Sequence, residues 1–259
     1  MADKLGCGVT KPSAILFDFG GTLDGASHWL DRFTAHYRAC GIEISRDELD
    51  PAFDFATKAG YAAGKPMERF KLGDLVRFLV GNQFEYLRRE GPDRIKESIL
   101  KMAPRDRFNA VERIRDSFLK ETVAALSTSR AILERLRGDY RLGVISNWYG
   151  NLDAIIAEAG MTRLFDAVVD STRVHSFKPH NEIFLAALKA MKVRAEEAAM
   201  VGDSMPKDCA PAHRLGMRTV FLRSTGSAAS TAQLEDGAGE AYRPDYMIES
   251  LEDLLKIRW

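Results

Sequence analysis

Four short apolar runs in this chain each end at an acidic or hydroxyl-bearing residue, and stretches with helical periodicity separate them. The runs and the residues that follow them are 13–17 with Asp18, 140–145 with Ser146, 165–169 with Asp170, and 198–201 with Asp203 after Gly202. Short strands that alternate with helices form a parallel sheet, and ligands bind outside the carboxyl ends of its strands. The pattern therefore predicts an α/β fold in which Asp18 and Asp203 meet at one edge, if their strands are neighbours.

The turn after the last of these runs carries two carboxylates. Asp203 and Asp208 lie within Gly-Asp-Ser-Met-Pro-Lys-Asp. Mg²⁺ takes oxygen ligands and usually meets one or two protein carboxylates. The turn therefore predicts a magnesium site. Gly-Asp-Ser also marks ordinary turns, and Asp208 could equally cap the helix that follows.

A long segment between the first two runs has helical periodicity and few strand-like stretches. The helices predicted there, between Gly and Pro breaks, span 28–40, 46–59, 67–90, 94–101 and 105–126, and the alternating pattern resumes with a helix at 130–137. We expect an all-α cap domain at 25–126, inserted into a core domain formed by residues 1–24 and 127–259. A loop rich in small residues is expected at 224–239, before a last short strand at 246–248.

Four motifs follow one another along the predicted core. They contain Asp18, Ser146, Lys178 before Pro179, and Asp203 with Asp208. In this order and spacing they resemble the haloacid dehalogenase superfamily, in the branch with a helical cap soon after the first motif. The resemblance implies a Rossmannoid parallel sheet with helices on both faces, plus the all-α cap inserted after the first strand.

The resemblance also implies a mechanism. Asp18 takes the place of the family's nucleophile, Ser146 that of its phosphate-binding hydroxyl, and Lys178 that of its charge-neutralising lysine. Further phosphate contacts expected beside these motifs are Asn147, Gly21 and Thr22. The implied activity is a phosphatase that hydrolyses a small phosphorylated metabolite through an aspartyl-phosphate on Asp18, a recognised form of covalent catalysis.

The implied cofactor is Mg²⁺. Its ligands would be Asp18, Asp203 and the backbone carbonyl of Gly20, with Asp208 behind them. Such an ion would stabilise the charge that spreads over the phosphoryl oxygens during transfer.

Gly20 departs from the family pattern, because most phosphatases of the family carry a second aspartate there as general acid and base. Such catalysis is worth about 10² to 10⁴ in rate. We therefore expect leaving groups that need little protonation, such as sugar 1-phosphates or acyl phosphates. Asp24 could replace the missing acid, or it could serve as a hinge or helix cap.

Other functions fit parts of the pattern. A binding or regulatory protein could keep the fold and the metal site without turnover, since fold does not certify activity. Carbon–phosphorus cleavage would use Lys58 or Lys65 as an imine. A mutase is disfavoured because it needs the absent aspartate, and a dehalogenase because its chemistry needs no metal.

Several polar or aromatic cap residues could contact the substrate, although core or surface roles are more common for such side chains. They are His28, Trp29, Arg32, His36, Lys65, Arg69 and Asn82.

Charge and cysteine content limit which partners and which compartment we expect for this protein. Lys plus Arg and Asp plus Glu both number 37, so bulk charge favours neither nucleic acid nor an anionic membrane. Three cysteines without CxxC spacing suit a reducing compartment, and we see neither a secretory signal nor an apolar run long enough to cross a membrane. We expect a cytoplasmic protein whose partner is a small phosphorylated substrate.

Overall fold

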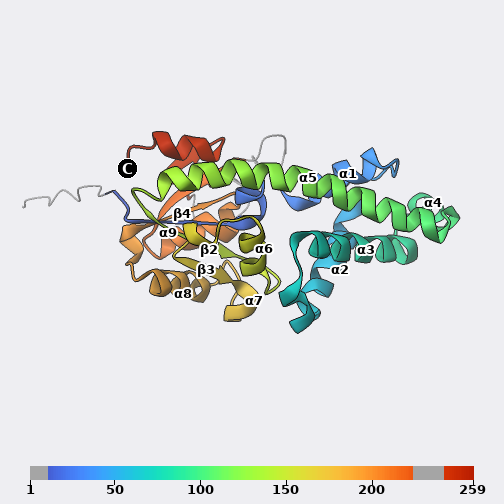
Figure 1. Ribbon diagram of the computed structural model, residues 1–259, viewed down its shortest axis with the longest axis horizontal. Helices are drawn as coiled ribbons and strands as arrows, with labels where there is room; N and C mark the ends of the chain where they lie inside the picture. The colour runs from blue at the N-terminus through green and yellow to red at the C-terminus, as the bar shows by residue number, and fades with distance from the viewer. Residues whose placement is uncertain (1–10, 224–241) are drawn as a thin grey trace, which may run out of the picture.

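Six parallel strands form the sheet of the core domain (Figure 1). The computed structural model describes residues 11–223 and 242–259, so the loop expected at 224–239 lies outside the described residues. The strands are β1 (Ala14–Phe17), β2 (Arg141–Ser146), β3 (Ala167–Asp170), β4 (Ala198–Gly202), β5 (Arg218–Leu222) and β6 (Tyr246–Ile248). Their order in the sheet is β3-β2-β1-β4-β5-β6. The α/β fold predicted from the sequence is confirmed, and so is the strand at 246–248.

The central strand β1 pairs with β2 on one side and β4 on the other. Successive side chains of a strand point to opposite faces. Ile15 and Phe17 of β1 accordingly join one buried cluster, and Ala14 and Leu16 join another. The first cluster includes residues of α5 (Pro104–Leu136) and α6 (Leu152–Glu158), and the second includes residues of α8 (Asn181–Met191) and α9 (Ala210–Arg214). Because helices cover both faces, the carboxyl ends of the strands are where a ligand can reach the sheet.

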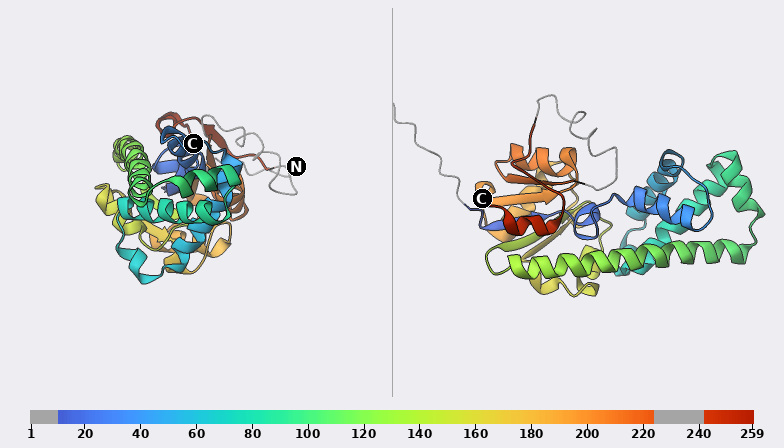
Figure 2. Two further views of the ribbon diagram at one scale, coloured as in Figure 1. Left: turned by 90° about the vertical axis from the view of Figure 1, so that its right-hand side faces the viewer. Right: turned by 90° about the horizontal axis from the view of Figure 1, so that it is seen from above.

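The cap forms a second lobe beside those carboxyl ends (Figure 2). It consists of α1 (Trp29–Ala39), α2 (Arg46–Ala62), α3 (Leu72–Glu90), α4 (Asp93–Lys101) and the first part of α5. Aromatic pairs pack inside it: Phe33 stacks on Phe118 with ring centroids 4.5 Å apart, and Tyr37 stacks on Phe84 at 5.4 Å. The four-residue helix α7 (Ser171–Val174) belongs to the core and follows β3.

The helix α5 corrects one expectation. We predicted two helices, 105–126 and 130–137, with a break between them, but the chain continues as one helix of 33 residues. The hydroxyls in the expected break are satisfied without ending the helix: Thr128 Oγ1 donates to the carbonyl of Ala124 (3.3 Å), and Ser129 Oγ donates to the carbonyl of Leu23 (2.7 Å). The expected junction between cap and core therefore falls inside a continuous helix.

A second predicted helix was too long. The helix predicted at 67–90 begins only at Leu72, because Lys65–Arg69 form a separate short helix and Phe70 is extended. Within the described residues, no helix is both long and apolar enough to cross a membrane.

Candidate active site

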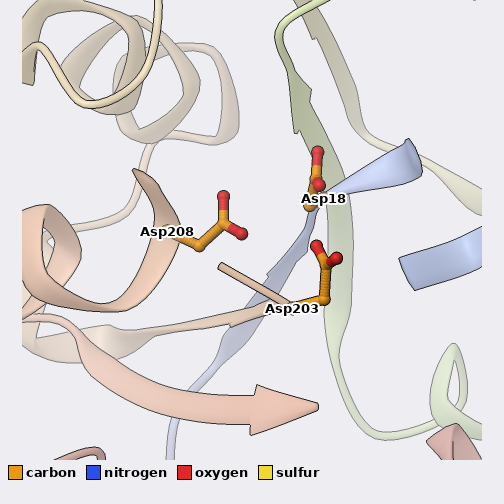
Figure 3. Close-up of side chains that lie close together, drawn as sticks. All are labelled: Asp18, Asp203 and Asp208. Atoms are coloured by element: carbon orange, nitrogen blue, oxygen red, sulfur yellow. The ribbon is translucent and has the colours of Figure 1, made fainter. Parts of the chain in front are cut away.

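Three aspartates lie together at the carboxyl edge of the sheet (Figure 3). Asp18 directly follows β1, Asp203 directly follows β4, and Asp208 comes from the next turn, Met205–Cys209. One carboxylate oxygen from each lies within 4.8 Å of the others. The meeting of Asp18 and Asp203 follows from the topology, because β1 and β4 are adjacent and parallel.

Lys178 and Ser146 bind the same carboxylate. Lys178 Nζ lies 2.7 Å from Oδ1 of Asp18 and 2.6 Å from Oδ1 of Asp208. Ser146, the last residue of β2, donates its hydroxyl to the same Oδ1 of Asp18 at 2.8 Å. All four side chains are buried. Neither bond to Asp18 uses its Oδ2, which leaves that oxygen for another partner.

The cluster carries more negative charge than the single lysine balances. Burial and the charges of Asp18 and Asp208 raise the pKa of Asp203 well above its usual value. Burial also raises the pKa of Asp208 to about 6, despite the opposing charge of Lys178. Burial alone would lower the pKa of Lys178, but the two carboxylates beside it outweigh that effect and raise it. A divalent cation would relieve this excess charge, and the oxygen donor set is of the kind Mg²⁺ prefers.

Two glycines make this close approach possible. A Cβ atom on Gly202 would collide with the carboxylate of Asp208, and one on Gly21 would collide with that of Asp203. Gly21 also has φ +85°, a conformation that side-chain-bearing residues rarely adopt. At both positions there is therefore no room for a side chain beside the carboxylate cluster, so glycine is required.

The remaining sequence-derived contacts divide into two groups. Asn147 and Lys178 exchange two bonds: the Asn147 Nδ2 donates to the Lys178 carbonyl (3.0 Å), and the Lys178 N–H donates to Asn147 Oδ1 (2.7 Å). Asn147 thus also positions the backbone of Lys178, which the sequence did not reveal. Gly21 and Thr22 are buried, and they are not among the described residues that line the adjoining cavity. Their role in phosphate binding stays a prediction.

Asp24 anchors the start of the cap. It is fully buried; its Oδ1 accepts from the Gly21 N–H (2.7 Å), and its Oδ2 accepts from the indole N–H of Trp29. Arg32 lies 3.5 Å from the same carboxylate. Burial raises the pKa of Asp24 to about 6, although the charge of Arg32 opposes the shift. Both carboxylate oxygens of Asp24 accept hydrogen bonds, and Asp24 is not among the described residues that line the cavity. Asp24 therefore fits the role of a structural anchor for the cap better than that of a replacement general acid.

Asp24 gives a prediction about pH. The folded protein holds the Asp24 proton to a higher pH than the unfolded chain does, because its pKa rises from 3.8 to about 6. Its ionisation therefore costs stability, and the free energy of unfolding falls as pH rises through this window. We expect the stability of wild type relative to Asp24→Asn to fall by about 3 kcal/mol between roughly pH 4 and pH 7. Urea unfolding in EDTA measures this difference.

The control for that experiment is Asp139→Asn, since the Asp139 side chain is 70% exposed. Its stability curve should run parallel to that of wild type. A parallel curve for Asp24→Asn as well would contradict the assignment of a buried, proton-binding carboxyl to Asp24.

The polar cap residues proposed from the sequence occupy different places. His28 and Trp29 line the cavity. Arg32 is buried, pairs with Asp24 and Glu121, and stacks its guanidinium 4.0 Å from the Phe118 ring. The other four, which do not line the cavity among the described residues, are His36, Lys65, Arg69 and Asn82.

A cavity of about 480 Å³ opens from the carboxylate cluster between core and cap. Gly20 lies in its wall, where a Cβ atom would stand 3.3 Å from the Trp148 ring and 3.7 Å from the Trp29 indole nitrogen. Two indoles therefore flank Gly20, the position at which the sequence resemblance leads us to expect a missing aspartate. Trp148 was not among the residues predicted from the sequence, although it lies two residues after Ser146.

Comparisons with known proteins identify a family and several relatives. A family model described as haloacid dehalogenase-like hydrolase matches residues 15–222. Glyceraldehyde 3-phosphate phosphatase from Methanocaldococcus jannaschii is 38% identical over 98 residues, which cover 38% of this chain and 40% of that protein. Pyrophosphatase PpaX from Bacillus cereus is 29% identical over 143 residues, which cover 55% of this chain and 61% of that protein.

The chain thus matches less than two thirds of the length of either relative. A crystal structure described as a dehalogenase with intermediate complex superposes with a TM-score of 0.59 at 18% identity, covering 95% of this chain and 96% of that one. At this identity the likeness shows a shared fold. Because the family model spans most of the sequence, from the first strand to the fifth, the chain belongs to the haloacid dehalogenase-like hydrolase family.

Proposed function

We propose that the protein is a Mg²⁺-dependent phosphatase that hydrolyses a small phosphorylated metabolite through an aspartyl-phosphate on Asp18. One observation carries this proposal: Asp18 directly follows a buried strand, and its Oδ1 is held by Ser146 and Lys178 beside the carboxylates of Asp203 and Asp208. A carboxylate nucleophile, a cation, a hydroxyl and a metal-type oxygen cluster are the parts that phosphoryl transfer needs.

The residues can be given roles from their contacts. Asp18 Oδ2 attacks phosphorus, the new O–P bond forms, and the bond to the leaving oxygen breaks. Lys178 and the Ser146 hydroxyl stabilise charge on the phosphoryl oxygens, and Asn147 fixes the position of Lys178. Water then hydrolyses the aspartyl-phosphate to free phosphate. Mg²⁺ held by Asp18, Asp203 and the Gly20 carbonyl, with Asp208 behind them, would neutralise phosphoryl charge during both steps.

Magnesium binding gives a further prediction. A ligand that binds only the folded protein at about 100 times its Kd stabilises it by about 2.7 kcal/mol. For a chain of this size, we expect saturating Mg²⁺ to raise the melting temperature by about 5 to 10 °C. A thermal scan in Mg²⁺ and in EDTA tests this, with Asp203→Asn expected to lose most of the shift. Identical melting curves with and without the ion would contradict the proposed metal site.

The other enzyme functions have less support. A dehalogenase shares the fold, but its chemistry does not call for the cluster of Asp203 and Asp208 beside Asp18. Carbon–phosphorus cleavage would need a lysine of the cap in the cavity, but neither Lys58 nor Lys65 is among its described lining residues. Lys58 instead pairs with Asp54 on the cap surface.

The names of the relatives fit phosphate chemistry, and one of them acts on pyrophosphate by name. Pyrophosphate releases phosphate, a leaving group that needs little protonation, which agrees with a glycine at position 20. The alternative remains a binding or regulatory protein with the same site. A panel of phosphate esters and anhydrides assayed with Mg²⁺ separates the two, because only the phosphatase turns any of them over.

A further inference from the structure

The cavity beside the carboxylate cluster has walls made largely of aromatic rings. Six rings from both lobes line it: Trp29, Phe53 and Tyr61 from the cap, and Trp148, Tyr149 and Phe177 from the core. Several contact one another across the gap between the lobes. The centroid distances are 4.8 Å for Tyr61 and Tyr149, 5.2 Å for Tyr61 and Phe177, and 5.3 Å for Trp29 and Trp148.

Three of these rings remain partly open to the cavity or solvent, while Trp29, Trp148 and Tyr149 are buried. Phe177 is 37% exposed, and Phe53 and Tyr61 are only half-buried. A cavity of about 480 Å³ lies within the range that holds small organic molecules. Half-open rings offer faces and edges on which a flat aromatic ligand can stack. The apolar part of the substrate therefore has a site ready for a ring.

The rings also begin close to the phosphate end. Phe177 immediately precedes Lys178, and Trp148 follows Ser146 by two residues. The Trp148 ring stands 3.3 Å from where a Cβ atom of Gly20 would be. If a substrate ring is bonded directly to the transferred phosphate, the carbon that carries the phosphate and the rest of the ring would therefore lie among aromatic side chains.

Outside the metal-type cluster, the described lining of the cavity contains no carboxyl group that could protonate a leaving group. The described acidic residues lining the cavity are Asp18, Asp203 and Asp208, all of them in the metal-type cluster. His28 also lines it, but its Nδ1 accepts from the Leu30 N–H (3.2 Å), and burial, with the nearby charge of Lys207, lowers its pKa. His28 is therefore neutral at neutral pH and a poor donor. Neither this imidazole nor a carboxyl group outside the cluster can therefore readily protonate the leaving oxygen, which favours leaving groups that depart as anions.

We propose that the preferred substrates are aryl phosphate monoesters, in which the phosphate is attached directly to an aromatic ring. This inference rests on the proposed function. A phenolic oxygen has a pKa near 10, far below that of an alkanol, and leaves as an anion much more readily. Asp18 forms the new bond to phosphorus, the electron pair of the broken P–O bond leaves on the aryl oxygen, and solvent protonates the aryloxide. Water then hydrolyses the aspartyl-phosphate.

Three substrates separate the two parts of this inference. Phenyl phosphate has a ring and an acidic leaving group, cyclohexyl phosphate has similar bulk with neither, and acetyl phosphate has an acidic leaving group without a ring. We expect kcat/KM for phenyl phosphate to exceed that for cyclohexyl phosphate by about 10² or more, since only the alkyl ester needs the absent acid. We also expect the KM for phenyl phosphate to lie below that for acetyl phosphate.

Phe177→Leu tests the ring site directly. It should lower the ratio of kcat/KM for phenyl phosphate to that for acetyl phosphate by about fivefold. The matched control is Phe108→Leu, because Phe108 lies on the surface of α5 and is 62% exposed; it should leave the ratio unchanged. If Phe177→Leu fails to fold, the comparison of the three substrates on wild type decides.

The outcomes distinguish this inference from the proposed function. Hydrolysis of acetyl phosphate with equal kcat/KM for the phenyl and cyclohexyl esters would overturn the aryl specificity and keep the phosphatase. The absence of turnover with all three, and of any phosphorylated Asp18 by mass spectrometry, would overturn both.

Discussion

We expect Asp18→Asn to lower the rate of p-nitrophenyl phosphate hydrolysis by about 10⁴-fold or more, because the variant lacks the covalent nucleophile. The leaving group of this substrate hardly needs a proton, so Gly20 does not mask the effect. An amide oxygen can still accept from Ser146 and Lys178, which hold Asp18 Oδ1 in the wild type. The fold should therefore survive, and the loss should appear in kcat.

Steady-state kinetics with Mg²⁺ measures this loss, and mass spectrometry of the acid-quenched wild type should find one phosphoryl group on Asp18. Asp139→Asn makes the same chemical change at an exposed carboxylate and should keep full activity. Turnover of Asp18→Asn within tenfold of wild type would exclude the covalent mechanism. If the wild type hydrolyses none of a broad panel of phosphate compounds, the result would favour a binding or regulatory protein.

Lys178→Met should cause the largest loss of stability at the site. Lys178 is buried between Asp18 and Asp208, at 2.7 and 2.6 Å. Removing one partner of a buried ion pair leaves uncompensated charge and typically costs about 3 to 5 kcal/mol. We expect a loss of this size in urea unfolding with EDTA at neutral pH, and a partial recovery with Mg²⁺, which would supply positive charge to the same carboxylates. Phosphatase activity should fall by at least about 10²-fold.

The matched control for this experiment is Lys189→Met, since Lys189 is an exposed residue in the last turn of α8. It removes the same charge from the surface and should change stability little. Equal unfolding curves for Lys178→Met and Lys189→Met in EDTA would mean that the buried ion pairs do not balance the cluster.

The arrangement of the strands and the acids at their ends could be predicted because it follows from a general rule. Parallel strands end at one edge, so Asp18 and Asp203 were expected to meet if β1 and β4 are adjacent, which they are. The role of Asp24 could not be predicted in the same way. The two carboxylate oxygens of Asp24 accept hydrogen bonds from Gly21 and Trp29, and the positions of these two residues depend on how the chain passes from the core to the cap.

Tertiary contacts also explain the other differences. Ser129 lies in a stretch that indicates a helix break, but it donates to the Leu23 carbonyl on a neighbouring segment, so the helix continues. The ring site depends on two lobes meeting: Tyr61 lies in the cap and Tyr149 in the core, 88 positions apart in the sequence, yet their ring centroids are 4.8 Å apart. Helical periodicity shows that a side chain can be buried but does not identify its partner across a lobe boundary.

The unbroken course of α5 limits how the protein can open. The helix runs through both lobes (Figure 2), and the second connection, near Leu23 and Asp24, is fastened by Ser129 and Arg32. One connection between the lobes is thus a continuous helix, and the other is held by hydrogen bonds, so both connections restrict how the lobes can move apart. We therefore expect the spacing between the two lobes to be largely set before a substrate binds, with ligand entry needing only a small rotation about the axis of α5.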